Sequence, residues 1–268
     1  MKISVITPTF NSEKTIAENI NSVISQTYEN FEQVIVDNLS TDSTLNIAEE
    51  LYSKKNYTEK LIIISEKDEG IADAFNKGIK RATGDLITIL NSDDSYFYSD
   101  IFKEVVKIFS EKDILFVHGD ILFKDRKFGT NVRRPLMCDL KVAMPFNHPT
   151  MFFRKEVYDN IGLFDKSFRY SMDFEFVCRL SKQYDLKKSG YYFDVNPMVI
   201  MKSGGASWMN EINSIKETKL ALKKHKLWNI KALYFYSSRI FRTKLKYIFD
   251  KLGFLFLVRF WRKLKWKN

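Results

Sequence analysis

The first ninety residues alternate between short apolar segments and segments with helical spacing, which limits the folds open to the chain. The apolar segments are rich in β-branched residues, as buried strands are. Strands separated by helices form right-handed βαβ units, so the sequence predicts an α/β fold with a mixed, mainly parallel sheet flanked by helices. We expect strands at 2–7, 31–37, 61–65 and 86–90, and helices at 12–26, 42–52 and 71–81, the last ended by Gly84.

The pattern becomes less regular after residue 95. Further strands are expected within 114–124, at 151–153 and in the extended stretch 191–202, and helices at 98–110, 155–161 and 172–183. The stretch 125–150 contains three prolines and a glycine and is expected to be a loop. From residue 211 the sequence becomes helical and basic.

Acidic residues follow three of the four predicted early strands. Asp37 ends the second, Asp68 follows the third, and Asp93 and Asp94 follow the fourth. The carboxyl ends of parallel strands meet at one edge of a sheet, where α/β proteins bind ligands. Each acid alone could be a turn residue or a helix cap. Four together repel one another, so we expect a divalent cation or a ligand to offset their charge.

Two common phosphate-binding motifs are missing from the sequence. There is no Gly-x-Gly-x-x-Gly after the first strand and no Gly-x-x-x-x-Gly-Lys-Ser/Thr anywhere. Both motifs let backbone amides surround a phosphate. If a diphosphate binds at this edge, a metal ion and side chains must hold it.

Five segments, in this order and spacing, resemble the family 2 glycosyltransferases of the GT-A fold. The resemblance covers about residues 1–210 and implies an inverting transfer of a sugar, UDP-linked, to an acceptor hydroxyl. The segments are Ile-Thr-Pro-Thr-Phe-Asn at 6–11, Val-Asp-Asn-Leu-Ser-Thr-Asp at 36–42, Glu-Lys-Asp-Glu-Gly-Ile-Ala-Asp-Ala-Phe-Asn-Lys-Gly at 66–78, Ala-Thr-Gly-Asp at 82–85 and Leu-Asn-Ser-Asp-Asp at 90–94.

The resemblance also implies which residues hold the donor. Thr7, Pro8 and Asp37 match positions that hold the base and ribose, and Asp68 matches a contact to the base. Asn91-Ser92-Asp93 matches the Asp-x-Asp motif, with Asn91 in place of the first carboxylate. Asn91 can hydrogen-bond a ribose hydroxyl but brings no charge to a metal, so Asp93 is the expected ligand of Mg²⁺ or Mn²⁺, and Asp94 the second choice. The full set of expected donor residues is Thr7, Pro8, Asp37, Asn38, Asp68, Asn91 and Ser92.

Displacement at an anomeric carbon requires a general base on the acceptor hydroxyl. Asp173 opens the predicted helix 172–183, and an acid there can simply favour the helix dipole. The segment 162–180 resembles the family signature in which this acid is the base, so we expect Asp173 to be catalytic. Glu175 is its competitor, and Arg179 is expected to pair structurally. The resemblance adds His148 and the glycine turn at Gly205 as expected substrate contacts, and Lys77 is a further one.

The last fifty residues differ in composition from the rest. Residues 216–268 contain sixteen Lys and Arg against two acids, a net +14, so the chain's +10 leaves −4 for residues 1–215. Twelve aromatic residues lie among these cations. Such a segment suits an anionic membrane surface, packing on the domain or between copies, or nucleic acid.

We therefore expect a glycosyltransferase domain at 1–215 and a basic aromatic helical tail at 216–268. The domain divides into a nucleotide-binding half, 1–95, and an acceptor half, 96–215. Residues 228–268 are expected to hold the protein on the inner face of the cell membrane, near a saccharide or lipid-linked acceptor, with a homo-oligomer contact as a further possibility. The two cysteines form no disulfide framework, and neither a secretory signal nor a stretch of about 20 apolar residues is present, which favours a cytoplasmic location.

Two other functions fit parts of the sequence. A sugar nucleotidyltransferase shares the α/β plan but needs a loop rich in Gly, Arg and Lys after the first strand, which the segment 7–11 lacks. A nucleic-acid-binding protein could use the basic tail, but the strand-end acids would repel phosphate without a metal. We expect no nucleic-acid partner.

Overall fold

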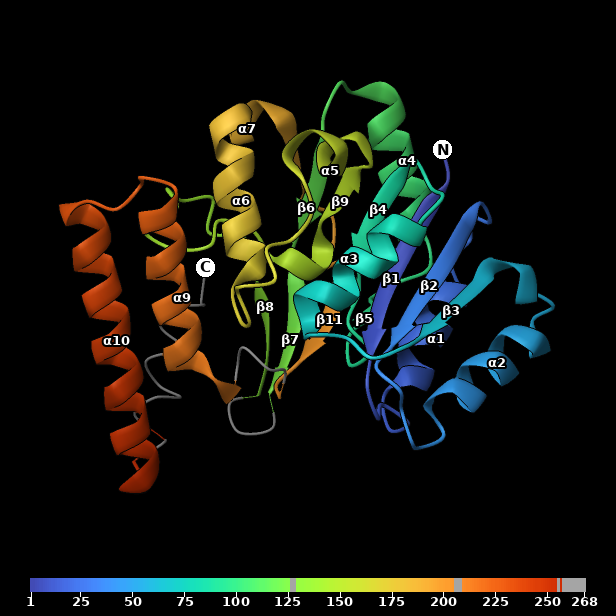
Figure 1. The fold of residues 1–268 in the computed structure, drawn as a ribbon, viewed down its shortest axis with the longest axis horizontal. Coiled ribbons are helices and arrows are strands. Elements are labelled where there is room, and N and C mark those ends of the chain that lie inside the picture. Colours follow the sequence, from blue (N-terminus) through green and yellow to red (C-terminus); the bar gives the residue numbers. More distant parts are fainter. Residues whose placement is uncertain (126–128, 205–208, 255, 257–268) are drawn as a thin grey trace.

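A computed structural model of the chain describes residues 1–125, 129–204, 209–254 and 256, and it has the predicted α/β architecture (Figure 1). The strands are β1 (Ile3–Thr9), β2 (Phe31–Asp37), β3 (Leu61–Ser65), β4 (Leu86–Ile89), β5 (Ser95–Tyr96), β6 (Phe116–Gly119), β7 (Ile121–Asp125), β8 (Gly129–Arg133), β9 (Phe152–Arg154), β10 (Gly190–Phe193) and β11 (Val199–Lys202). The helices are α1 (Ile16–Ile24), α2 (Thr44–Lys54), α3 (Ile71–Arg81), α4 (Ile101–Glu111), α5 (Glu156–Ile161), α6 (Met172–Gln183), α7 (Leu186–Ser189), α9 (Glu211–Lys224) and α10 (Ile230–Lys251), with 3₁₀ turns η1 (Thr58–Lys60) and η2 (His148–Thr150).

The larger sheet has the strand order β10-β6-β9-β4-β1-β2-β3. Its neighbouring pairs are parallel except where β9 runs against β4 and β6. The register sets Thr9 beside Asp37 and Asp37 beside Ser65, so the ends of β1, β2 and β3 are level. The mainly parallel sheet predicted from the sequence is confirmed.

Apolar side chains of the sheet pack against helices on both faces. Strand residues such as Ile6 and Phe153 form one buried cluster with α3, α5 and α6, and Val5 and Phe152 form another with α4 and the smaller sheet. α1 and α2 pack together over Ile35. The smaller sheet, in the order β5-β11-β7-β8, brings β11 beside β5, which directly follows Asp94. The two sheets thus meet at the acidic turn.

The structure corrects the sequence prediction in two places. The stretch 125–150, expected to be a loop, contains β8 and η2. β8 is mostly exposed and contains one apolar residue, Val132, so it lacks the alternation that marks a strand and forms by pairing with β7. Gly84 does not end α3, because the helix stops at Arg81. A Cβ atom at Gly84 would lie 2.8 Å from the backbone oxygen of Lys2 and from the backbone nitrogen of Ser4 in β1, so the position has no room for a side chain.

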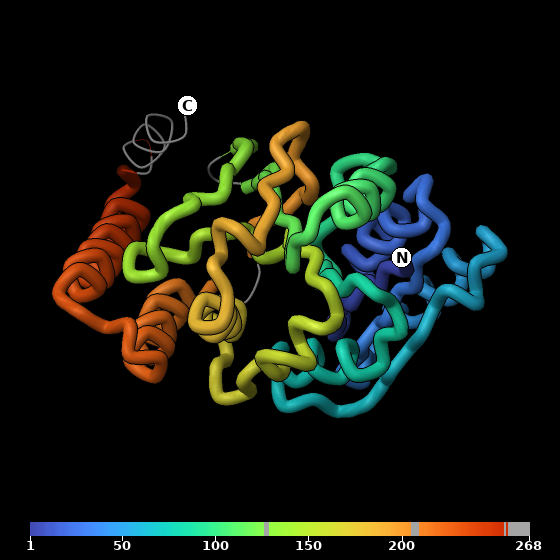
Figure 2. The backbone as a smooth tube through the Cα atoms, turned by 90° about the horizontal axis from the view of Figure 1, so that it is seen from above, coloured from blue at the N-terminus to red at the C-terminus, as the bar shows by residue number. Residues whose placement is uncertain are grey.

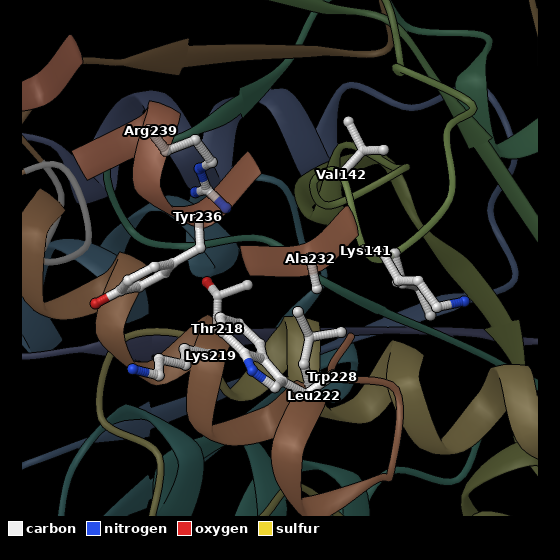
Figure 3. Close-up of a pocket in the computed structure, with 10 residues that line it drawn as sticks. Lys141, Val142, Thr218, Lys219, Leu222, Trp228, Ala232, Tyr236 and Arg239 are labelled. Carbon is white, nitrogen blue, oxygen red and sulfur yellow. The ribbon is translucent and has the colours of Figure 1, made fainter. Parts of the chain in front are cut away.

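Two C-terminal helices extend the molecule beyond the sheet. α9 packs against α6 and α10 against α9, at the end of the molecule opposite β3 and α2 (Figures 1 and 2). Lys219 lies over the rings of Trp228 and Tyr236, at 5.4 and 5.1 Å, beside a hollow lined by residues of α9, α10 and the segment 140–142 (Figure 3). None of the helices in the described part of the chain combines the length and hydropathy that a membrane span requires.

Candidate active site

The acidic turn after β4 is held in place by a buried chain of polar side chains. Asn19 of α1 is fully buried, and its Nδ2 donates to the carbonyl oxygens of Asn91 and Asp94 at 2.9 and 3.0 Å. Gln33 Nε2 donates to Asn19 Oδ1, and Tyr52 donates to Gln33 Oε1. The turn therefore has a fixed shape set by α1, β2 and α2. Asn19 was not among the predicted site residues, because its neighbours in the sequence give no sign of this role.

Asp93 and Asp94 form a partly buried pair of like charges at this turn. Asp94 is 2% exposed, and Asp93 is more open. Burial raises the pKa of Asp93. Burial and then the neighbouring Asp93 carboxylate raise the pKa of Asp94 well above its usual range. Both carboxyl groups therefore lack a partner that fully compensates their charge, as expected of a site that receives a cation.

Lys202 at the end of β11 is the cation whose charge acts on the pKa of both carboxyl groups. Its charge lowers the pKa of both Asp93 and Asp94, against the stronger effect of burial. The Lys202 ammonium forms an ion pair with Glu18 of α1, and that contact lowers the pKa of Glu18. Lys202 was not among the predicted site residues, because only the pairing of β11 with β5 brings it here.

The loops after β2 and β3 bind each other. Asp37 is fully buried, and its carboxylate accepts hydrogen bonds from the Ser40 amide and hydroxyl and from the Ser65 hydroxyl. Asn38 Oδ1 accepts from the Asp68 amide at 2.8 Å. The structure thus brings the expected donor residues Asp37, Asn38 and Asp68 together at the sheet edge.

Lys77 of α3 lies against the segment that carries Asp68. Its ammonium is 2.9 Å from Glu66 and donates to the carbonyl oxygen of Lys67 at 2.7 Å. Asp73, one helical turn earlier, is 3.7 Å away. Lys77 therefore holds this loop in place through these contacts, and its contact with substrate stays a prediction.

The remaining expected donor residues lie where β1 and β4 end. The buried Thr7 hydroxyl accepts from Gln33 Nε2 at 2.8 Å, so this side chain is committed to the core. Pro8 follows it in β1 and is partly exposed. The Ser92 hydroxyl lies 2.9 Å from that of Ser12, which ties the acidic turn to the loop after β1.

Asp173 of α6 and His148 of η2 lie close enough for their charges to interact. Asp173 lies in the first turn of α6 and is partly exposed, and one of its oxygens accepts from the Phe174 amide. Burial lowers the pKa of His148, while the Asp173 charge acts in the opposite direction. The His148 ring also stacks on Phe75 of α3, 5.8 Å between centroids. The His148 imidazole therefore lies near the expected base and also against Phe75 of α3.

Glu175, the competitor of Asp173, is engaged elsewhere. It is 1% exposed and accepts hydrogen bonds from Arg179, whose guanidinium also donates to the carbonyl oxygens of Ile161 and Leu163. His225 at the end of α9 hydrogen-bonds Glu175 Oε1 through Nε2 at 2.8 Å. Arg179 pairs structurally, as expected, and Glu175 joins α6 to α9.

Glu217 of α9 caps the start of α6. Its carboxylate accepts hydrogen bonds from the backbone amides of Arg169, Tyr170 and Ser171, at 2.7–3.0 Å. Amides that precede a helix have no partner within it, so an acid here fixes the direction in which the helix begins. Asp173 lies two residues beyond Ser171. The predicted boundary at residue 215 falls inside α9, and the division into domain and tail stays a prediction.

Side-chain contacts also join the two halves across the site. Asn76 of α3 donates to the carbonyl oxygen of Phe164 and accepts from its amide, both at 2.8 Å. Lys166 lies 2.8 Å from Glu69 and 3.3 Å from Asp73. The loop before Asp173 is thus attached to the loop that carries Asp68. Gly205, an expected substrate contact, lies outside the described residues.

The charge pattern suits one divalent ion held jointly with a ligand. Among the residues that the structure describes, no group of three or more His, Cys, Asp or Glu could hold a metal alone. Mg²⁺ commonly uses one or two carboxylates plus phosphate oxygens and water. Asp93 and Asp94 supply two carboxylates with raised pKa values, so the residues fit such an ion.

These features define an α/β protein of the GT-A fold, with acidic residues at one edge of the parallel strands and a further carboxylate, Asp173, at the start of α6. Residues 4–178 match the family described as Glycosyl transferase family 2, and the chain belongs to this family. It is a glycosyltransferase, as its sequence resemblance indicated. A PGL/p-HBAD biosynthesis glycosyltransferase of Mycobacterium bovis is 33% identical over 180 residues, which cover 66% of this chain and 68% of the relative.

Solved structures share the fold. TarS 1–349 of S. aureus in complex with UDP-GlcNAc has a TM-score of 0.65 and 22% identity, covering 83% of this chain and 66% of that one. The chain spans 40% of a longer TarS chain, with a TM-score of 0.64. The mannosyltransferase PcManGT from Pyrobaculum calidifontis, in complex with GDP-Man and Mn²⁺, has a TM-score of 0.62 and 16% identity, covering 91% of this chain and 75% of that one.

The charge at Asp94 yields a stability prediction. A carboxyl group whose pKa is raised by folding stabilises the protein below its unfolded pKa, about 3.9, and that stability is lost as the pH rises through the folded pKa. Asp94→Asn removes this loss. We expect the variant, in EDTA at pH 7, to be about 1–2 kcal/mol more stable than the wild type in urea unfolding, and the difference to vanish near pH 3.

The matched control is Asp113→Asn, which changes an exposed acid. We expect no difference from the wild type beyond about 0.5 kcal/mol for this variant. An Asp94→Asn protein that is less stable than the wild type at pH 7 would show that the carboxylate is compensated within the folded chain.

Proposed function

We propose that this enzyme transfers a sugar, with inversion, from a UDP-linked donor to an acceptor hydroxyl in surface polysaccharide or glycolipid synthesis. One observation carries the proposal: burial raises the pKa of the carboxyl pair at the end of β4, and a separate carboxylate, Asp173 of α6, lies close enough to His148 to act on its pKa. Inverting displacement requires this division between charge stabilisation at the leaving group and a base at the nucleophile.

The donor nucleotide lies along the ends of β1 to β4. The loops after β2 and β3, carrying Asn38 and Asp68, receive the base, and Asn91 and Ser92 face the ribose. Asp93, the more open acid of the pair, is the first ligand of Mg²⁺ or Mn²⁺, and Asp94 is the second. Such an ion would neutralise charge on the departing diphosphate. Lys202 adds a positive charge at the same place once its pairing with Glu18 is relaxed.

On the acceptor side Asp173 takes the proton from the attacking hydroxyl. The Phe174 amide donates a hydrogen bond to Asp173 Oδ1, which fixes the orientation of the carboxylate and leaves Oδ2 to accept the proton. The acceptor oxygen then forms a bond to the anomeric carbon while the bond to the diphosphate breaks. His148 stays neutral because burial lowers its pKa, so it can orient the sugar without competing for the proton.

The relatives support the donor and the kind of acceptor. TarS was solved with UDP-GlcNAc and PcManGT with GDP-Man and Mn²⁺, so nucleotide sugars and a divalent ion suit this fold. The mycobacterial relative is named for PGL/p-HBAD biosynthesis, which supports a lipid-linked or glycolipid acceptor.

Asp173→Asn tests the base. Because the amide cannot accept the proton, we expect UDP release from a UDP-hexose, with nitrophenyl hexosides as acceptors, to fall by about 10²–10⁴-fold. Donor binding, measured by thermal shift with Mn²⁺, should stay unchanged. Asp159→Asn, an exposed acid of α5, is the control and should keep full activity. Full transfer by Asp173→Asn would remove this residue as the base.

The outer face of α10 supports attachment to an anionic membrane. Its apolar stripe consists of Ile230, Tyr234, Phe241, Ile248 and Leu252, which are 52–80% exposed and recur at helical spacing. Lys and Arg residues flank the stripe, and the opposite face packs through Ala232 and Thr243. Apolar side chains between cations suit the interface of anionic lipid. We propose a peripheral position on the inner face of the cell membrane.

The double variant Phe241→Ser/Ile248→Ser tests this attachment. Losing two apolar side chains from the interface should weaken binding to phosphatidylglycerol vesicles at least about tenfold. Leu220→Ser removes an exposed apolar residue of α9 and serves as the control. Unchanged vesicle flotation by the double variant would contradict the membrane position, and a change from dimer to monomer would instead assign the stripe to contact between copies.

A further inference from the structure

Two more strands of the larger sheet end at the edge that carries the acidic turn. β6 and β10 are parallel to each other, and β6 and β4 both run against β9, so β6, β10 and β4 share one direction. Asp120 follows β6 and Asp194 follows β10. β6 lies two strand spacings from β4, about 10 Å. The reaction described above assigns no role to these acids.

Asp120 has one carboxylate oxygen without a close donor. Oδ1 accepts from the Tyr192 hydroxyl at 2.7 Å. Oδ2 lies 3.9 Å from Arg134 Nε, beyond hydrogen-bond distance, and accepts no hydrogen bond from the part of the chain that the structure describes. The Asp120 side chain is 11% exposed and that of Arg134 is 71% exposed. Asp120, Arg134, Tyr192 and Asp194 are called the Asp120 cluster below. Its Asp120 carboxylate is buried, and the Arg134 guanidinium lies on the solvent side of it.

The cluster is attached to the segment that positions His148. Asn147 Nδ2 donates to the carbonyl oxygens of Gly119 and Arg133, each at 3.0 Å. These two residues directly precede Asp120 and Arg134, and Asn147 directly precedes His148. Since the charge of Asp173 acts on His148, the Asp120 cluster is connected to the expected base through the segment 147–148.

A buried ring keeps the Tyr192 side chain in place. His118 of β6 is 1% exposed and stacks on Tyr192, with ring centroids 5.5 Å apart. Burial lowers the pKa of His118 to about 4, so it is neutral, and its Nδ1 has no hydrogen-bond partner among the described residues. Tyr192 can therefore donate to Asp120 without competition from an imidazolium.

The charges of the Asp120 cluster indicate which kind of ligand it can bind. Among the residues that the structure describes, the charges that act on Asp120 are those of Asp194 and Arg134, so two carboxylates stand against one guanidinium. Burial and then Asp194 raise the pKa of Asp120, against the effects of Tyr192 and Arg134. A phosphate would be repelled here. A neutral polyol would be bound, since its hydroxyls donate to Asp120 and accept from Arg134.

We propose that Asp120 and Arg134 bind neighbouring hydroxyls of the acceptor sugar. The proposal deepens the glycosyl transfer proposed above and rests on it. Asp120 Oδ2 accepts from one hydroxyl, the Arg134 guanidinium donates to the next, and Tyr192 holds Asp120 in position. The cluster thus favours a saccharide acceptor over one that offers only a phosphate near the reacting hydroxyl.

The test separates acceptor binding from donor binding and from chemistry. Steady-state kinetics use a UDP-hexose, Mn²⁺ and a panel of nitrophenyl hexosides, with Asp120→Asn and Arg134→Gln. We expect each variant to raise the KM for the nitrophenyl hexoside at least tenfold, with kcat changed less than threefold. Thermal shift by the UDP-hexose should equal that of the wild type. Asp113→Asn and Arg81→Gln change exposed residues and serve as matched controls.

Several results would overturn the proposal. The first is an unchanged KM in both variants. The second is loss of the UDP-hexose thermal shift, which would assign the cluster to the donor's sugar. The third is a wild-type protein that binds no nitrophenyl hexoside in saturation-transfer NMR with UDP and Mn²⁺. Asp173→Asn tests the base separately. If Asp173→Asn is fully active while Asp120→Asn raises the KM, the proposed mechanism is wrong but the acceptor-binding role of Asp120 stands.

Discussion

The repulsion between Asp93 and Asp94 is the constraint on which the rest of the site depends. Two adjacent carboxylates are held at the end of a buried strand, where burial raises the pKa of both. The protein does not relax this repulsion, because Asn19 fixes the backbone of the turn through its bonds to Asn91 and Asp94. The metal-bound diphosphate proposed for this site would offset that cost in free energy.

The second half of the molecule fixes the expected base relative to this turn. Glu217 sets the start of α6 by accepting three backbone amides, and Asn76 joins α3 to the loop before it. His148 then fills the space between Asp173 and α3, stacked on Phe75. The inverting reaction proposed above needs the base on the side of the sugar opposite the diphosphate, and rigid coupling of the halves would keep it there. α9 contributes to that coupling although its composition resembles the tail.

The parts that the sequence predicted are those with local signals. Strands β2 and β3 and helices α3 and α6 begin and end where their periodicity indicated, and the acids after the parallel strands meet at one edge because topology requires it. The groups that hold the site are different. Asn19, Lys202 and Glu217 act on residues 45 or more positions away in the chain, so their own neighbours give no indication of their role. β8 was missed for the same reason, since its partner strand rather than its apolar pattern defines it.

The carboxylates after β4 are proposed to bind the donor through a divalent ion. The most direct measurement is a thermal-shift screen of UDP-sugars with and without Mn²⁺, on the wild type and on Asp93→Ala. We expect one UDP-sugar to raise the melting temperature of the wild type by several degrees only when Mn²⁺ is present, and to leave Asp93→Ala unchanged. Equal stabilisation without Mn²⁺, or by the same sugar nucleotide in Asp93→Ala, would contradict the account.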